Sequence, residues 1–107
     1  MWEIDLSGIG KRIQDRRKHL MLTQEQLAEM MDVSIQMISN LERGNKAIRI
    51  DNLIRLSQIL NTSTDYILTG KPTMEEVNSL SLRIAKLPEK ERKMIELLVD
   101  YCSPENN

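Results

Sequence analysis

The sequence predicts an all-α protein of seven helices, five forming a small domain and two following it. Apolar residues recur three and four positions apart along most of the 107 residues, the spacing of helices with one buried face. β-Branched residues never alternate with polar ones over several positions, and no Asn-Gly or Asp-Gly hairpin turn occurs. The composition is 40% hydrophobic and 29% charged with only four Gly and three Pro, which is typical of a helix-rich globular protein.

The first two helices are predicted from apolar spacing and from one capping arrangement. A helix over about 7–20 has an apolar face formed by Leu6, Ile9, Ile13 and Leu20. Thr23 is then followed by Gln26, which is the spacing of a capping box, where each side chain bonds the other residue's backbone N–H. We therefore expect a second helix over 23–31.

Three more helices complete the first predicted domain. Ser34 is a favourable N-cap for a helix over 34–43, and Gly44 is a common residue at a helix end. The apolar spacing resumes at 50–60, and a short fifth helix follows, capped near Thr62–Ser63 and ended by Gly70. Short helices with shorter connections indicate that residues 1–70 form one domain.

Residues 71–107 are predicted to form a C-terminal helical dimerisation segment. Thr73 and Glu76 have the spacing of a capping box for a sixth helix, and Pro88 fits the first position of a seventh. The seventh helix carries more apolar residues than one buried face requires. It therefore either packs on the first domain, meets a second copy, or docks an antagonist or activator protein. The residues expected at a dimer interface are Met94, Ile95, Leu98, Tyr101 and Cys102.

The charge balance argues mildly against a nucleic-acid partner. The net charge is −1, and residues 1–70 carry nine Lys/Arg and nine Asp/Glu, whereas phosphate-binding domains are usually basic. The cations are unevenly placed, because residues 11–19 hold five Lys/Arg and His19 against the single Asp15. Two interpretations remain open for this run: a solvated helix face, or a local patch that attracts an anion.

No group of residues predicts an enzyme, a cofactor or a metal site. His19 is the only histidine, and Cys102 is the only cysteine and lies on an apolar face. Because there is a single cysteine, an internal disulfide and a multi-cysteine metal site are both excluded. No glycine-rich phosphate loop or metal-ligand spacing occurs. No apolar run approaches the length of a membrane span, and residues 1–8 do not resemble a signal peptide. We expect a cytoplasmic protein with no membrane partner.

The helix over 34–43 has a polar face that suits base edges in DNA. Two helices joined by about three residues form a helix-turn-helix, and the major groove accepts one helix. Amides match the donors and acceptors of bases, and an apolar side chain such as Ile35 can contact a thymine methyl. A merely solvated face, which would more often carry Lys and Glu, is the alternative. The polar residues away from the apolar stripe are Gln36, Ser39, Asn40 and Arg43.

The segment LTQEQLAEMMDVSIQMISNLERG resembles the helix-turn-helix of phage-repressor and Cro-type regulators, also called the xenobiotic-response-element family. The likeness continues through LIRLSQILNTSTDYILTG and covers roughly residues 6–70. It implies a five-helix, lambda-repressor-like DNA-binding domain with two additional C-terminal helices. It also implies a prokaryotic or phage transcriptional regulator, expected to be a repressor, that binds a two-fold symmetric double-stranded operator as a homodimer. The alternative is a protein-interaction module, an antagonist or adaptor, that keeps this fold without binding DNA itself.

The resemblance also assigns roles to individual residues. Gln24, at the start of the predicted helix over 23–31, matches a position that binds a phosphate oxygen. Arg17 and Glu42 match a pair that forms an internal ion pair. The base-contacting positions are matched by Ile35, Gln36 and Asn40, with Ser39 beside them, and the loop that contacts the DNA backbone is matched by Arg43, Asn45 and Lys46.

Three positions depart from the family's usual residues. Met21 replaces a Gly between the first two helices, so we expect that turn to be strained or shaped differently. Arg49 replaces a small capping residue, where a cation opposes the helix dipole. A phosphate contact would offset that cost, and the alternative is that Arg49 extends into water. Ile35 replaces a polar residue, and either contacts a thymine methyl or stabilises the helix start.

Overall fold

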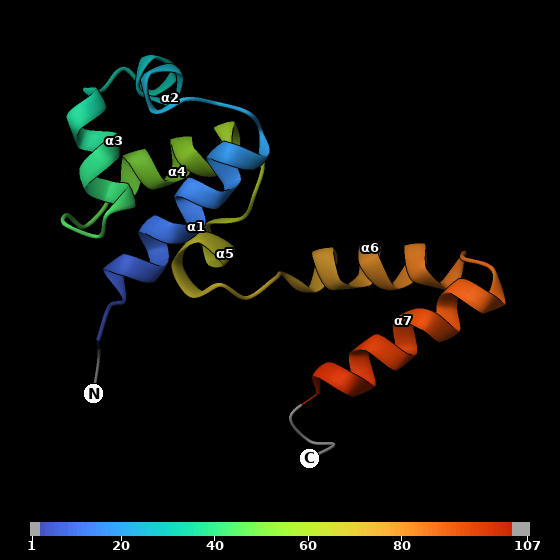
Figure 1. The fold of residues 1–107 in the computed structure, drawn as a ribbon. Helices are drawn as coiled ribbons and strands as arrows, with labels where there is room; N and C mark the ends of the chain where they lie inside the picture. Colours follow the sequence, from blue (N-terminus) through green and yellow to red (C-terminus); the bar gives the residue numbers. More distant parts are fainter. Residues whose placement is uncertain (1–2, 104–107) are drawn as a thin grey trace. The chain divides into compact units, whose positions relative to one another are not determined.

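The computed structural model describes residues 3–103, and these form seven α-helices with no strand among them (Figure 1). The first helix begins and ends one residue earlier than the range 7–20 expected from the sequence. In chain order they are α1 (Leu6–His19), α2 (Gln24–Met31), α3 (Ile35–Glu42), α4 (Ile50–Ile59), α5 (Thr64–Thr69), α6 (Met74–Ala85) and α7 (Glu89–Cys102). The chain divides into two compact units, Met1–Thr73 and Met74–Asn107, each described separately below.

The core of the first unit draws on all five of its helices. Helix α1 packs against α3 and α5, α2 packs against α3 and α4, and α4 packs against α5. Leu20 was expected to face inward but is 37% exposed, because α1 ends at His19 and Leu20 is its C-cap. The buried cluster consists of Ile9, Ile13, Leu27, Ala28, Met31, Ile38, Leu53, Leu56, Leu60 and Ile67.

The helix starts follow the expected capping residues in the first unit. The capping box at Thr23 is confirmed, since Gln26 N–H donates to Thr23 Oγ1 at 3.0 Å and Thr23 N–H donates to Gln26 Oε1 at 2.8 Å. Ser34 and Ser63 cap α3 and α5 in the same way through their hydroxyl oxygens. Pro88 was expected as the first helical residue of α7 but is its N-cap, because its ψ of 155° is extended. Local capping therefore sets most helix starts.

Four helices end in the same pair of backbone hydrogen bonds around a residue in the left-handed conformation. After α1, Leu22 N–H donates to Arg17 O at 3.0 Å and Met21 N–H donates to Lys18 O at 2.9 Å, with a φ of 61° at Met21. This is a Schellman motif, which favours glycine at the left-handed position. The corresponding residues after α2, α3 and α4 are Asp32, Gly44 and Asn61. Met21 alone among these four has a long side chain, so this turn carries backbone strain.

Three arginines bind the carbonyl oxygens at the ends of other helices. Arg12 Nε donates to Ile67 O at 2.8 Å, at the end of α5. Arg16 donates to Leu60 O through both Nε (3.1 Å) and Nη2 (2.8 Å), at the end of α4. Arg55 Nη1 donates to Met31 O at 3.3 Å, at the end of α2. These bonds satisfy carbonyl groups that a helix leaves without intrahelical partners.

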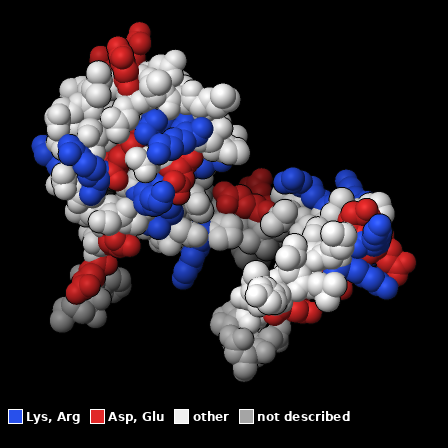
Figure 2. Space-filling model, in the orientation of Figure 1, with Lys and Arg blue, Asp and Glu red and all other residues white. Residues whose placement is uncertain are grey.

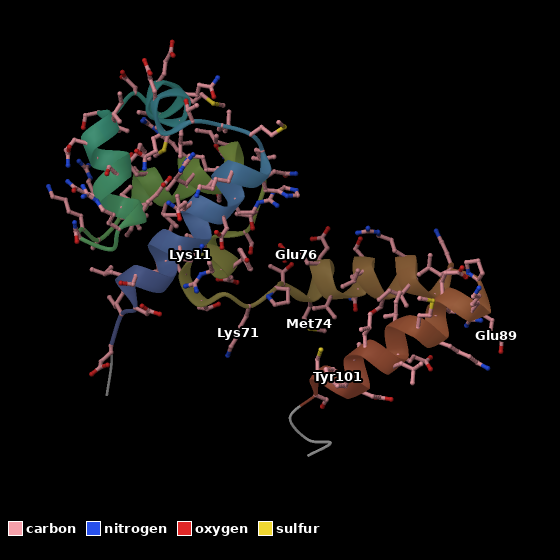
Figure 3. The ribbon with its side chains drawn as sticks, in the orientation of Figure 1. Lys11, Lys71, Met74, Glu76, Glu89 and Tyr101 are labelled. Carbon is pink, nitrogen blue, oxygen red and sulfur yellow. The ribbon has the colours of Figure 1, made fainter. Side chains whose placement is uncertain are left out.

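The second unit has no buried residue in either of its helices. In α7 the apolar side chains from Met94 to Cys102 cover about half of the helix circumference. Ile84 and Ile95 are half-buried. Glu89 and Tyr101 mark the two ends of α7 in Figure 3, and Tyr101 is 88% exposed. The other large apolar side chains exposed in this unit are Met74, Val77, Leu80, Leu82, Leu87, Met94, Leu97, Leu98 and Val99.

Candidate nucleic-acid interface

Helix α3 turns its apolar side inward and its amide-bearing side outward. Ile38 and Leu41 are buried at 0% and 3% exposure. On the other side, Ile35 is 47% exposed, which leaves its side chain available to a partner. The remaining expected base-contacting residues, all accessible, are Gln36, Ser39 and Asn40. The structure therefore gathers the four residues on one outward surface, which we call the α3 face.

Gly10 sets how closely α1 approaches the end of α3. A Cβ atom at this position would collide with the backbone oxygens of Leu41 and Glu42, and backbone cannot move aside as a side chain can. A residue with a side chain would therefore push α3 away from α1. Gly10 could not be recognised as important from the sequence, because nothing local distinguishes it from an ordinary helical glycine.

A buried ion pair joins α1 to the end of α3. Arg17 Nε donates to Glu42 Oε2 at 2.7 Å, and Arg17 Nη2 donates to Glu42 Oε1 at 3.0 Å. The two side chains are only 8% and 1% exposed. Hydrogen bonding to Glu42 raises the pKa of Arg17, and this effect exceeds the opposing effect of burial. The guanidinium is thus a permanently charged link between the two helices.

Gln24 is tied to the same ion pair. Its Nε2 donates to Glu42 Oε1 at 3.1 Å, and its side chain is half-buried. The second Nε2 hydrogen and the Oε1 atom have no partner in this contact. Gln24 is also the first residue of α2, where backbone N–H groups favour an anion. The structure thus places Gln24 at a helix start with its amide orientation fixed by Glu42.

The polar residues of α3 bond one another along the helix surface. Gln36 Nε2 donates to Asn40 Oδ1 at 3.2 Å, and Arg43 Nη2 donates to the same oxygen at 3.4 Å. Arg43 Nε also donates to the backbone oxygen of Ser39 at 3.4 Å. The Gln36, Asn40 and Arg43 side chains therefore form one hydrogen-bonded row on the α3 face.

The loop after α3 lies next to this row. Asn45 N–H donates to Asn40 O at 2.9 Å, which closes the end of α3, and Gly44 takes a φ of 76°. Asn45 and Lys46 are both exposed. The expected backbone-contacting loop is therefore continuous with the α3 face.

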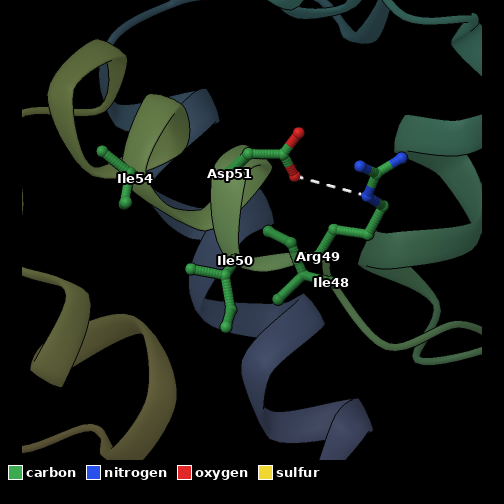
Figure 4. Close-up of a pocket in the computed structure, with 5 residues that line it drawn as sticks. All are labelled: Ile48, Arg49, Ile50, Asp51 and Ile54. Carbon is green, nitrogen blue, oxygen red and sulfur yellow. Dashed lines mark ion pairs between the residues drawn. The ribbon is translucent and has the colours of Figure 1, made fainter.

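Arg49 forms an ion pair with Asp51 that was not expected from the sequence. It is the N-cap of α4 and makes no side-chain capping bond. Its Nε lies 3.4 Å from Asp51 Oδ1, as Figure 4 shows, and the two side chains are 77% and 54% exposed. Asp51 Oδ1 also accepts the Asn52 N–H at 2.9 Å, so a first-turn carboxylate offsets the cation at this helix start. Ile48, Ile50 and Ile54 form the apolar part of this shallow surface.

The basic run over 11–19 is mostly engaged within the protein. Arg12 and Arg16 bind helix ends and Arg17 pairs with Glu42, as described above. Lys11 forms an exposed pair with Asp15 at 3.0 Å. On the face of the Met1–Thr73 unit seen in Figure 2, basic and acidic atoms are interspersed. Neither of the two interpretations offered for this run describes its arginines, which are structural.

Metal-ligand clusters and membrane-spanning helices are both absent from the residues that the structure describes. Within residues 3–103, no group of three or more His, Cys, Asp or Glu side chains is arranged to hold a metal ion. The same stretch contains no helix long and apolar enough to cross a membrane.

Comparison with known proteins identifies the fold. The model of the helix-turn-helix family HTH_3 matches residues 13–67, which is half of the chain. The chain belongs to this family. The resemblance to Cro/C1-type helix-turn-helix regulators and the all-α, lambda-repressor-like fold are thus both confirmed. The family is one of transcriptional regulators rather than enzymes, as expected.

Three similar proteins illustrate this membership of HTH_3. The chain is 35% identical over 75 residues to the transcriptional regulator ImmR of Bacillus subtilis, covering 70% of this chain and 58% of ImmR. It is 36% identical over 89 residues to DicA of Escherichia coli, covering 83% of this chain and 65% of DicA. The chain thus spans about three fifths of the length of these two relatives. The crystal structure of the phage P22 c2 repressor with a synthetic operator has 41% identity and a TM-score of 0.57, covering 59% of this chain and 96% of that one.

Proposed function

We propose that this protein is a sequence-specific double-stranded DNA-binding transcriptional regulator that inserts α3 into the major groove. The observation that carries the proposal is the outward α3 face, where amides occupy the exposed side of a helix whose other side is buried. Gln36 and Asn40 provide donors and acceptors for base edges, Ser39 lies beside them, and Ile35 provides an apolar contact for a thymine methyl. The similar P22 c2 repressor was crystallised with an operator, which supports the same partner class here.

Phosphate contacts flank the α3 face in this proposal. Gln24 offers its remaining amide hydrogen and the backbone N–H groups at the start of α2. The side chains after α3 that reach solvent near the same surface are Arg43, Asn45, Lys46 and Arg49. These contacts would fix the protein's register on the duplex without reading sequence themselves.

We also infer that the protein acts as a homodimer through the α6–α7 unit. A helix pair with no buried residue has too little core to be stable alone, so its apolar side chains need a partner surface. Of the expected interface residues, Met94, Leu98, Tyr101 and Cys102 are exposed and Ile95 is half-buried. A second copy would also explain discrimination, because one reading helix covers only a few base pairs and a two-fold dimer reads two half-sites.

Repression by occupying the operator is the simplest mechanism, because it requires no contact with RNA polymerase and no bound effector. The dimer would block access of RNA polymerase to the DNA that it covers. This activity belongs in the cytoplasm, where the chromosome of a prokaryotic cell is found. A separate antagonist that binds the α6–α7 unit would act by breaking the dimer.

The DNA-binding proposal is tested by selecting bound duplexes from a random pool at fixed salt. The wild type should enrich a two-fold symmetric site, and Gln36→Ala and Asn40→Ala should each relax preference at defined bases. Gln58→Ala is the matched control, since Gln58 is an exposed helical amide outside the α3 face. Absence of enrichment by the wild type at low salt would reject the proposal in favour of a protein-interaction module.

The dimer proposal is tested by sedimentation equilibrium of the full chain. Leu98→Glu should shift the protein to monomer and weaken operator binding at least tenfold, because it places a charge in the apolar surface. Asn78→Glu introduces the same charge at an exposed position of α6 and should leave the oligomeric state and the operator affinity unchanged. A wild type that sediments as a monomer at all concentrations would favour docking of another protein on this surface.

A further inference from the structure

The Asn40 side-chain oxygen is occupied by two donors from its own helix. Gln36 approaches from one turn before it and Arg43 from the residues after it, at 3.2 and 3.4 Å. Arg43 is itself held over the last turn of α3 by its bond to the Ser39 backbone oxygen. The Asn40 side-chain oxygen therefore accepts two hydrogen bonds, although the side chain is accessible to solvent.

This arrangement decides which groups Asn40 can offer to a partner. A carboxamide oxygen has two lone pairs, and both point to donors here. The two hydrogens on Asn40 Nδ2 have no such partners among these bonds. Asn40 consequently presents hydrogen-bond donors and no acceptor at the outer surface of α3.

We propose that Arg43 is a specificity-determining positioning residue, which together with Gln36 orients the Asn40 amide as a pure donor that selects guanine. Guanine shows two acceptors, N7 and O6, in the major groove, whereas adenine shows the acceptor N7 and the donor N6 amino group. A donor-only amide can bond both guanine acceptors but faces an unmatched donor on adenine. The inference rests on the proposed function, because it assumes that α3 enters the major groove.

Gln36, in the same hydrogen-bonded row, can offer a partner both a donor and an acceptor. One of its Nε2 hydrogens is used by Asn40, which leaves the other hydrogen and the Oε1 acceptor. One donor beside one acceptor is the pair that bonds adenine N7 and N6. Each operator half-site should therefore contain an adenine that depends on Gln36 and a guanine that depends on Asn40.

The experiment compares affinities for two duplexes that differ only at the base pair assigned to Asn40. That base pair is the position where Asn40→Ala loses discrimination in the selection described above. Arg43→Lys keeps the positive charge but replaces the guanidinium fork, and Arg43→Met removes both. Lys46→Met is the matched control, since it removes a neighbouring exposed cation that makes no bond to Asn40. Circular dichroism of each variant checks that α3 is intact.

The wild type should prefer guanine over adenine at that position by about tenfold. Both Arg43 variants should reduce this ratio to less than about threefold, and adding Asn40→Ala to either should reduce it no further. Lys46→Met should weaken binding to both duplexes equally. A wild-type preference for adenine, or Arg43 variants that keep the guanine preference, would overturn this inference while leaving the proposed function standing. Loss of all sequence preference in the wild type would overturn both.

Discussion

Arg17 and Glu42 form a two-bond ion pair that is almost fully enclosed between α1 and the end of α3. Arg17 Nη1 also donates to Leu22 O at 2.7 Å, and Gln24 donates to the same carboxylate. One buried charge pair therefore links α1, the turn after it, the start of α2 and the end of α3. These are the elements that position the α3 face.

Arg17→Met should lower the free energy of unfolding by about 3–5 kcal/mol, because it leaves the Glu42 carboxylate buried without its partner. Lys11→Met is the matched control in the same helix. It breaks the exposed pair with Asp15 and should cost less than about 1 kcal/mol. Urea denaturation measures both values. Similar losses for the two variants would contradict a special role for the buried pair.

The stabilisation from Arg17 should be independent of pH across the neutral range. Its pKa is raised in the folded protein, so its contribution is fully present below the unfolded pKa and is lost only as pH rises through the folded pKa, in strong alkali. Arg17 should therefore add no slope to the wild-type free energy of unfolding between about pH 6 and about pH 9. Denaturation series at several pH values test this, and a slope would point to another titrating group.

Gly10→Ala should destabilise the protein by about 1–3 kcal/mol, because the new methyl group meets backbone oxygens of α3. It should also weaken DNA binding, since α3 must shift away from α1. Gly8→Ala is the control in the same helix, where the methyl meets only side-chain atoms of Asp5 and Arg12, which can move. Denaturation and DNA titration should show a smaller loss for Gly8→Ala than for Gly10→Ala in both measurements.

Met21→Gly should stabilise the protein by about 1 kcal/mol, because glycine adopts the left-handed conformation without strain. Little packing is lost, since Met21 is 88% exposed. Met30→Gly makes the same change inside α2, where it should destabilise by about 1 kcal/mol. Thermal or urea unfolding distinguishes them. A destabilised Met21→Gly variant would mean that the Met21 side chain contributes contacts that offset the strain.

Arg49→Ser should separate stability from DNA binding. Serine is a favourable N-cap for α4 and should stabilise the free protein by about 0.5–1 kcal/mol. If Arg49 contacts a phosphate, the same variant should weaken operator binding and reduce the slope of log affinity against log salt by about one. An unchanged slope would show that Arg49 extends into solvent beside Asp51 when DNA is bound.

Features encoded by neighbouring residues were predictable from the sequence. The capping box at Thr23 and the hydroxyl caps at Ser34 and Ser63 involve partners within three residues, so spacing alone indicates them. The strained turn at Met21 was also visible, because the family usually has glycine there. The polar outer side of α3 was predictable as well, from the helical spacing of its apolar residues.

Features that depend on distant partners were not predictable. Arg12 and Arg16 looked like a surface charge run, yet they bind carbonyl oxygens more than 40 residues away along the chain. The orientation of the Asn40 amide is likewise set by which side chains reach it, which residue identity does not specify. The α7 sequence shows excess apolar surface but does not say what covers it.

The bond from Arg12 to Ile67 has a consequence for how the chain matures on the ribosome. Arg12 also donates to Leu68 O at 3.1 Å, so the first helix of the domain is secured by the last one. Until residue 68 has left the exit tunnel, Arg12 has no acceptor and Ile67 has not filled its place in the core. The α3 face is therefore synthesised before the core of the five-helix unit is complete, and that core is filled only after α5 has emerged.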